Sequence, residues 1–264
     1  MQYLALCLYC RDENSYLEEW LEYHFSIGID HVIIYDNSSF KPIKLTIKEL
    51  GFAHKVTVLS DSNQEPGRVC LAYRNCLAEY SRAFKWIGFI DTDEFLVPKT
   101  TPNMASFLAD YEHFASLGIF WYCFGSNGHH KRQPLITEAF TKRSGDGFHA
   151  NAHIKSIVNT DFTAVVPPLD PHHFKFHPGF SCVDENETEL RGPKGIHVSK
   201  KIQLNHYVLR SRDEWNEKMA RGSPNHGKGK TIDFFKEYDA VCNRFCDDEI
   251  LRIRRTSGAG KSKT

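Results

Sequence analysis

The stretch Trp86-Ile87-Gly88-Phe89-Ile90-Asp91-Thr92-Asp93-Glu94-Phe95 decides the expected fold, because an uncharged apolar run leads directly into three carboxylates. Such a run, rich in aromatic and β-branched residues, is typical of a strand buried on both faces of a sheet. Asp91 and Asp93 are two positions apart, so in an extended chain both side chains point to the same side. Open α/β sheets bind ligands at the carboxyl ends of their strands. The stretch therefore predicts a ligand site that contains both aspartates.

The two aspartates suit a divalent cation. Mg²⁺ and Mn²⁺ usually take a few protein carboxylates and complete their coordination with water and phosphate oxygens. The alternative is local, since acidic residues after a strand also cap the next turn or helix. The buried strand before Asp91 favours the interpretation as a metal-diphosphate site.

The first ninety residues alternate between strand-like and helix-like patterns. Apolar runs predict strands, and spaced apolar residues between polar turns predict helices. The expected strands are 3–9, 31–35, 55–59 and 86–90, and the expected helices are 15–27, opened by a capping box at Ser15, and 68–83, with Leu71, Ala72, Cys76, Leu77 and Tyr80 inward. Parallel neighbours need crossover connections, so this order predicts a Rossmann-like, mostly parallel sheet with helices on both faces.

Three of these strands end in polar clusters, at residues 11–14, 36–39 and 91–94. The carboxyl ends of parallel strands meet at one edge of a sheet, so we expect the clusters to converge. No Gly-x-Gly-x-x-Gly follows the first strand, and no Gly-x-x-x-x-Gly-Lys-Ser/Thr follows any strand. Side chains must therefore hold a base or ribose, and Asp36 is placed to accept hydrogen bonds from a ring N–H or a sugar hydroxyl.

The second half contains short strand-like pieces at 118–124, 153–158 and 202–207 among loops rich in Gly, Pro and His. Such a loop-rich half is typical of substrate-specific surface. Residues 121–130 combine aromatic and small side chains, as in a wall on which a sugar ring stacks, although a core strand followed by a turn has the same pattern. Ser211 is expected to open a helix over 212–219. The basic stretch 221–230 is able to close over a phosphate, or is a solvated loop.

Composition limits the classes of function. The 264 residues contain 33 Lys and Arg against 33 Asp and Glu, so there is no global field that attracts nucleic acid. No run has the length of a membrane span, and the first residues lack the basic region of a secretory signal. The eight cysteines are dispersed, several within apolar runs, which favours a reducing, cytoplasmic setting. Cys7 and Cys10 have the spacing of a zinc motif, but on a strand they face opposite sides.

Four motifs in order are similar to those of glycosyltransferase family 92 and its bacterial relatives among the family-2-like transferases. They are residues 11–20, 35–39, 86–95 and 205–207, within a likeness that extends from about Tyr3 to Arg221. The resemblance implies a GT-A fold, a nucleotide-sugar donor with a UDP-sugar favoured, Mn²⁺ or Mg²⁺, and inversion at the anomeric carbon. It implies one domain over 1–251, with a nucleotide-sugar half (1–97) and an acceptor half (98–251). Residues 252–264 are expected to form a basic disordered tail.

The resemblance also assigns roles to residues. The implied metal ligands are Asp91, Asp93 and His206. The residues expected at the donor are Arg11, Glu13, Asp36, Asn37, Arg68, Asp91, Thr92, Asp93, Lys155 and Arg221, with His173 and Lys228 as further candidate cations. Those expected at the acceptor are Trp121, Phe124, Gly125, Ser126 and His173. Inversion requires a base for the acceptor hydroxyl, for which Glu138 is the first candidate and Asp146 the second.

Two alternatives compete with this interpretation. Phosphatases of the haloacid-dehalogenase type also carry Asp-x-Asp after an apolar strand, but their pattern requires Thr or Val where this chain has Phe95. The other alternative is a homologue that binds a nucleotide or glycan without turnover. For an enzyme of this family the expected acceptor is a glycan or glycolipid. The basic tail would also allow peripheral contact with an anionic inner membrane face.

Overall fold

The computed structural model describes residues 1–62, 65, 67–168, 170–222 and 231–257. The N-terminal part forms four parallel strands, β1 (Gln2–Cys10), β2 (His31–Asp36), β3 (Val56–Ser60) and β4 (Phe84–Phe89). Between them lie α1 (Leu17–Ser26), α2 (Ile43–Glu49) and α3 (Arg68–Tyr80). The parallel, Rossmann-like start predicted from the sequence is confirmed, and the sequence analysis missed only α2.

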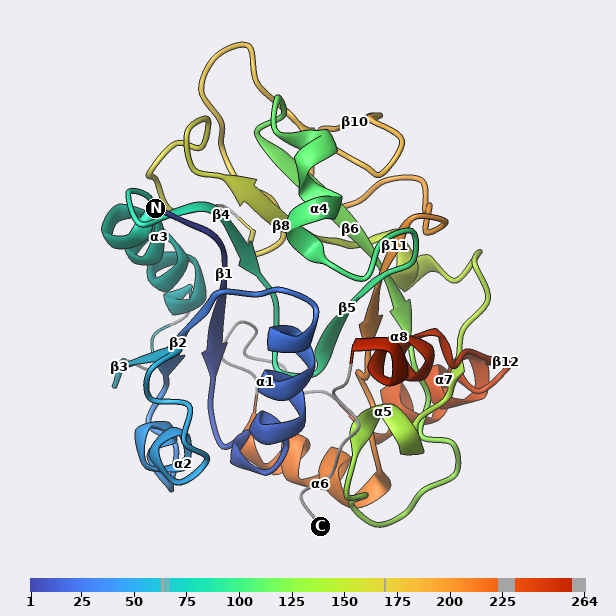
Figure 1. Ribbon diagram of the computed structural model, residues 1–264. Helices are drawn as coiled ribbons and strands as arrows, with labels where there is room; N and C mark the ends of the chain where they lie inside the picture. The colour runs from blue at the N-terminus through green and yellow to red at the C-terminus, as the bar shows by residue number, and fades with distance from the viewer. Residues whose placement is uncertain (63–64, 66, 169, 223–230, 258–264) are drawn as a thin grey trace.

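Six further strands of the described residues extend the same sheet. They are β5 (Glu94–Pro98), β6 (Ser116–Cys123), β8 (Ile154–Asn159), β9 (Cys182–Val183), β10 (Glu189–Leu190) and β11 (Ile202–His206). The order is β10-β9-β6-β8-β4-β1-β2-β3, and β11 pairs with both β5 and β6. Strand β8 is antiparallel to β4 and β6, and β11 is antiparallel to β5. Strands from both halves of the sequence thus form one mixed α/β sheet (Figure 1).

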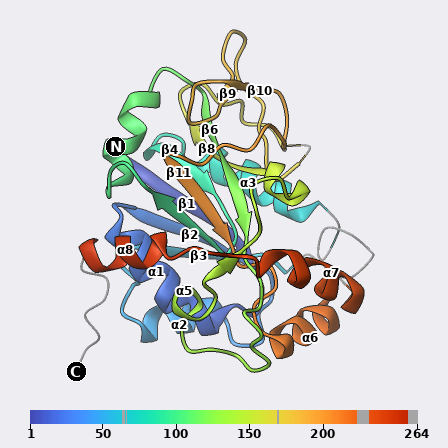
Figure 2. The same ribbon diagram turned by 90° about the vertical axis from the view of Figure 1, so that its right-hand side faces the viewer.

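Helices cover both faces of this sheet. Along β1, Leu4, Leu6 and Leu8 belong to the core under α1, whereas Ala5 and Cys7 belong to the core under α3. Successive strand residues point to opposite faces, so an uninterrupted apolar strand builds both cores. Figure 2 shows the strands between α1 on one side and α3 on the other. This arrangement agrees with the GT-A expectation.

Shorter elements complete the chain. They are α4 (Met104–Leu108), α5 (Ile136–Ala139), α6 (Arg212–Arg221), α7 (Ile232–Cys242) and α8 (Glu249–Ser257), with a separate two-stranded antiparallel sheet of β7 (Lys142–Arg143) and β12 (Phe245–Cys246). Short 3₁₀ turns lie at Asn14–Tyr16, Ala109–Tyr111 and His149–Ala152. Among the described residues, no helix is long and apolar enough to cross a membrane.

Three local expectations need correction. Residues 252–257 are helical in α8, where a disordered tail was expected; Ile250 and Ile253 are buried and anchor the helix, and residues 258–264 lie outside the described part. The predicted capping box at Ser15 does not form, because a 3₁₀ turn at Asn14–Tyr16 precedes α1. Leu71 is 38% exposed, and Val69 and Tyr73 are buried on the inner side of α3.

Candidate active site

The turn between β4 and β5 carries the acidic motif. The Asp91 N–H donates to Glu94 Oε2 at 2.8 Å, and the Glu94 N–H donates to the Asp91 carbonyl at 3.1 Å. The motif is therefore a tight turn that continues into β5, with no helix after it. Both aspartates lie at the carboxyl end of β4, as the sequence predicts.

Lys155 of β8 neutralises the first aspartate. Its Nζ lies 2.8 Å from Asp91 Oδ2 and 3.6 Å from Glu94 Oε2. The Lys155 side chain is 2% exposed, whereas that of Asp91 is 43% exposed. Burial acts to lower the pKa of Lys155, but the Asp91 and Glu94 carboxylates raise it above its usual value. Burial raises the pKa of Glu94 to about 8, against the effect of Lys155. A cation is thus held beneath Asp91, which stays open to solvent.

Asp93 is more enclosed and lies between two basic side chains. Its Oδ2 accepts a hydrogen bond from Lys218 Nζ at 2.7 Å, and its Oδ1 lies 3.8 Å from His206 Nε2. Burial acts to raise the pKa of Asp93, but Lys218, His206 and Arg210 lower it well below the usual range. His206 ends β11, which pairs with β5, so the sheet itself brings His206 to the aspartate.

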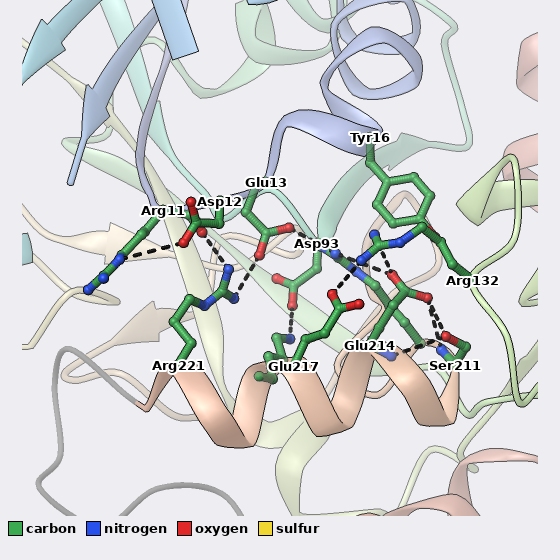
Figure 3. Close-up of polar contacts among 12 residues, drawn as sticks. Arg11, Asp12, Glu13, Tyr16, Asp93, Arg132, Ser211, Glu214, Glu217 and Arg221 are labelled. Carbon is green, nitrogen blue, oxygen red and sulfur yellow. Dashed lines mark hydrogen bonds and ion pairs between the residues drawn. The ribbon is translucent and has the colours of Figure 1, made fainter. Parts of the chain in front are cut away.

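A second carboxylate, Glu13 in the loop after β1, connects this edge to α6. Glu13 Oε2 accepts from Arg210 Nη1 at 2.8 Å, and Oε1 accepts from Arg221 Nη2 at 3.0 Å. Burial acts to raise the pKa of Glu13, but Arg210, Lys218 and Arg221 lower it. Figure 3 shows the contact between Glu13 and Arg221 beside α6. Glu13 and Arg221 therefore form part of the scaffold around Asp93.

A pocket opens between the loop after β1 and α6. It encloses about 350 Å³, including space open to solvent. Its lining consists of Asp12, Glu13, Ser15, Tyr16, Arg132, Leu209, Arg210, Glu214, Glu217, Lys218 and Arg221. Since Lys218 both lines the pocket and binds Asp93, the pocket adjoins the acidic motif.

The sequence model of glycosyltransferase family 92 matches residues 3–233, which is most of the chain and includes the acidic turn, Glu13 and α6. The chain belongs to glycosyltransferase family 92. A family 92 protein of Ricinus communis is 27% identical over 229 residues, which cover 83% of this chain and 37% of the relative. One of Oryza sativa subsp. japonica is 28% identical over 191 residues, which cover 69% of this chain and 31% of the relative. The chain thus spans about a third of the length of these plant relatives.

Solved structures with similar folds have low sequence identity. S. aureus TarS 1–349 is 13% identical with a TM-score of 0.46, covering 97% of this chain and 72% of that chain. Glucosyl-3-phosphoglycerate synthase from Mycobacterium tuberculosis, in complex with Mn²⁺, uridine diphosphate and glucosyl-3-phosphoglycerate, is 15% identical with a TM-score of 0.34. That alignment covers 61% of this chain and 57% of the mycobacterial one.

The predicted nucleoside residues of this family 92 chain organise the end of β2. Asp36 accepts the N–H groups of Ser39 at 3.0 Å and Ile43 at 2.9 Å. Asn37 Nδ2 donates to the Asp61 carbonyl at 3.0 Å, and Arg68 forms an ion pair with Asp61 at 2.7 Å. Their contact with a nucleoside stays a prediction.

Two other residues predicted at the donor lie in the loop after β1 and in the acidic turn. Arg11 is exposed, and its main-chain carbonyl accepts from Arg221. Thr92 is buried between the two aspartates.

The predicted acceptor wall is only partly assembled. The Trp121 ring lies 4.3 Å from that of His206, 5.1 Å from that of His153 and 5.1 Å from that of His172, so it stands next to the acidic site. Phe124 is fully buried against Tyr207, which corrects its expected role as a sugar-stacking surface.

The small residues after Phe124 also face the protein interior. Gly125 packs so closely on the end of α7 that an added Cβ would lie 2.8 Å from the Cys242 carbonyl oxygen. Ser126 is buried, and its N–H donates to Asp239 Oδ1. Trp121 is therefore the member of the wall that lies beside the site.

The candidate bases lie in other surroundings. Glu138 is exposed on α5, whose neighbouring N–H groups, Ile136 and Thr137, donate to Glu19 of α1. Asp146 accepts from Tyr122 Oη at 2.8 Å, and Tyr122 alternates with Trp121 on β6 and so faces the other way. In the described part of the chain, neither has a polar contact with Asp91 or Asp93, and their role as base stays a prediction.

Of the two further candidate cations, the structure describes only His173. His173 Nε2 lies 3.2 Å from the Leu190 carbonyl, beside β10. Lys228 falls outside the described residues.

The sequence analysis missed two basic residues of the site, Arg210 and Lys218. The position of Lys218 could have been predicted from the sequence. Ser211 forms a capping box with Glu214, which determines where α6 begins and therefore which residues share each side of it. Lys218 and Arg221, three residues apart, share one side of the helix. No sequence pattern predicts the position of Arg210, because it precedes α6 and its backbone is left-handed, with φ 55°, so helical spacing does not apply to it.

Proposed function

We propose that this chain carries the catalytic site of a metal-dependent, inverting glycosyltransferase that moves a sugar from a nucleotide-sugar donor to a glycan or glycolipid. One observation supports this most. Asp91, Asp93 and His206 all lie at the carboxyl edge of the sheet of a family 92 chain, with Lys155 and Lys218 against the two aspartates. A cytoplasmic location would suit a nucleotide-sugar donor.

The chemistry to be catalysed gives a role to the cations beside the two aspartates. Breaking a sugar–phosphate bond leaves negative charge on the diphosphate, and fixed cations stabilise that charge in the transition state. Lys155 and Lys218 are held by carboxylates, and Arg221 lines the same pocket as Lys218. Together they offer positive charge where a diphosphate would lie, between the ends of β1 and β4.

The side-chain atoms at this edge also fit the coordination of a divalent ion. Two ligands that are each about 2.1 Å from one ion lie roughly 3–4 Å apart, and Asp93 Oδ1 and His206 Nε2 are 3.8 Å apart. Asp91 Oδ1 would add a third ligand while its Oδ2 stays with Lys155. These three side chains would hold Mn²⁺ or Mg²⁺, which would supply further stabilisation of the diphosphate. Among the described residues, no three such side chains form a preassembled metal site, so Asp91 would have to turn toward the other two to share one ion with them.

The acceptor is proposed to approach along Trp121. Its ring is partly exposed beside His206 and offers an apolar face to a sugar. Family membership gives no support to the phosphatase alternative, whereas binding without turnover remains the competing function.

The test is thermal unfolding with UDP, GDP, CDP or ADP, each with and without Mn²⁺. A ligand at 100 times its Kd adds about 2.7 kcal/mol, which raises the midpoint by roughly 5–10 °C for a chain of this size. We expect one nucleotide, UDP first, to give this shift only with Mn²⁺. Asp93→Asn should abolish it, and Asp110→Asn, an exposed acid in another part of the chain, should not.

Two results would contradict the proposal. If none of the nucleotides shifts the midpoint, the site does not bind a nucleotide-sugar donor. If UDP binds but UDP-sugars are neither hydrolysed nor transferred with Mn²⁺, the chain is a binding homologue.

A further inference from the structure

Arg210 has an unused hydrogen-bonding edge. Its side chain is 5% exposed, and its Nη1 donates to Glu13 Oε2. Its Nε and Nη2 are also buried, yet neither has a hydrogen-bond partner among the described residues. Buried donors without partners are rare in folded proteins, because each has lost its hydration without replacement. This edge therefore requires an explanation.

The two N–H groups on this side of the Arg210 guanidinium determine which chemical group can bind there. The Nε–H and one Nη2–H of a guanidinium point in parallel from the same side, which matches the two oxygens of a carboxylate or phosphate. Burial acts to lower the pKa of Arg210, but the surrounding carboxylates keep it above its usual value, so the group is a permanent cation. A neutral hydroxyl would satisfy one N–H, whereas an oxyanion would satisfy both.

The acids around the pocket are already committed to other partners. Glu13 is shared by Arg210 and Arg221. Glu214 accepts from Ser211 and lies near Arg132, and Glu217 forms an ion pair with Arg132. Asp12 accepts from the Phe40 N–H. Glu214 Oε1 also lies 3.8 Å from Arg210, but it faces Nη1, so among the described residues no carboxylate forms a hydrogen bond with the Nε–Nη2 edge.

The pocket extends away from the expected nucleoside position. At one end, the Asp12 N–H donates to Ser39 Oγ and the Asn37 N–H donates to the Cys10 carbonyl, so this end adjoins the loop after β2. Tyr16 and Arg132 stand at the other end, with Asp93 between (Figure 3). Arg210 lies on the Tyr16 side, with its guanidinium 5.0 Å from the ring centre.

We propose that the Nε–Nη2 edge of Arg210 binds a carboxylate or phosphate group carried by one of the sugar substrates. The inference rests on the proposed function, since it takes Asp93 as the position of the transferred sugar. The group belongs either to the donor sugar, as in a uronic acid, or to the acceptor. Arg210 Nε and Nη2 are both shielded from solvent, so the pocket must widen before such a group can reach them. Ser15, Arg132 and Glu217 are exposed and line its outer side, where they can move at low cost.

The test compares charged with neutral sugars on the whole chain by titration calorimetry. One arm measures UDP-glucuronate against UDP-glucose, and the other measures glucuronate and glucose 6-phosphate against glucose in the presence of UDP and Mn²⁺. We expect the charged sugar to bind about tenfold tighter or better in one arm, as two charge-assisted hydrogen bonds predict. A preference in the first arm assigns the anion to the donor, and one in the second assigns it to the acceptor.

Variants tie the preference to Arg210. Arg210→Lys keeps the charge beside Glu13 but lacks the two-pronged edge, so it should lose the preference. Arg254→Lys is the matched control, because Arg254 forms a comparably buried ion pair with Glu19 away from the pocket. If Arg210→Lys does not fold, Ser15→Glu against Ser15→Gln gives the same information from an exposed position. The added charge should weaken binding of the charged sugar only.

Equal binding of charged and neutral sugars in both arms would overturn the inference, as would a preference that survives in Arg210→Lys or Ser15→Glu. These failures are distinct from failure of the proposed function. In that case UDP itself would not stabilise the chain, whereas here UDP would bind and only the selectivity for charge would be missing.

Discussion

His24 connects α1 to the strand that leaves the acidic turn. It is fully buried, its Nδ1–H donates to the Trp20 carbonyl at 2.8 Å, and its Nε2 accepts from the Leu96 N–H at 3.3 Å. Both ring nitrogens are therefore used in one neutral tautomer. Burial lowers the pKa of His24 to about 3, so the folded chain holds an uncharged imidazole here at neutral pH.

This histidine makes stability depend on pH. Its pKa is lower in the folded chain than in the unfolded one, so the unfolded chain binds more protons between the two values. The free energy of unfolding should then be highest above about pH 6.5 and fall as the pH drops toward 3, by up to about 1.4 kcal/mol per pH unit. Urea unfolding at several pH values checks this. His24→Gln, which retains a donor and an acceptor, should have a shallower slope, and an unchanged slope would exclude His24 as the source.

At the scale of elements, α8 shows how tertiary packing orders a basic segment. The sequence from Arg252 onward is mostly basic and small, which led to the expectation of disorder. In the structure, Ile250 and Ile253 are buried, and Arg254 of the same helix forms ion pairs with Glu19 of α1 and a hydrogen bond with Thr137 of α5. The helix thus links α5 to α1, and its polar partners Glu19 and Thr137 lie far away in sequence.

Ile253→Ala should destabilise the chain by about 2–4 kcal/mol, because it removes a buried side chain and leaves a cavity. Arg255→Ala, an exposed position on the same helix, should change stability by less than about 0.5 kcal/mol. Denaturant unfolding of the two variants gives the comparison. Equal stabilities of both variants and the parent chain would mean that α8 does not pack on the core in solution.

At the scale of the whole molecule, one sheet is shared by the nucleotide-sugar half and the acceptor half of the expected single domain. Strand β4 of the first half pairs with β8 of the second, and β5 pairs with β11. The same pairing positions the site, because β8 brings Lys155 to Asp91 and β11 brings His206 to Asp93. Folding and assembly of the site are therefore coupled.

A fragment of residues 1–97 should accordingly not fold alone. It would leave the edges of β4 and β5 unpaired, and it would remove Lys155 from the buried Glu94. Circular dichroism and urea titration should give no cooperative transition for the fragment and a single one for the full chain, with partial recovery on adding residues 98–264. A cooperative transition of the fragment alone would show that the first half is an independent domain.

The sequence by itself determined the class of fold and the place of the acidic motif. The strands β1 to β4 are continuous apolar runs, and the crossovers α1 and α3 have clear helical spacing, so local pattern sufficed for them. The position of Asp91 and Asp93 at a strand end follows from the same pattern. Ser211 also had a local signal, because a capping box is formed within four residues.

Only the tertiary structure decided which basic groups meet these acids. Lys155, Arg210 and Lys218 reach Asp91, Glu13 and Asp93 through contacts that span between 64 and 197 positions. No periodicity within one element encodes such a contact. Trp121 and Phe124 look alike in sequence, yet the pleat and the neighbouring α7 leave one beside the site and bury the other in the core. Local chemistry fixes the elements, whereas the pairing of distant strands fixes the charges around the site.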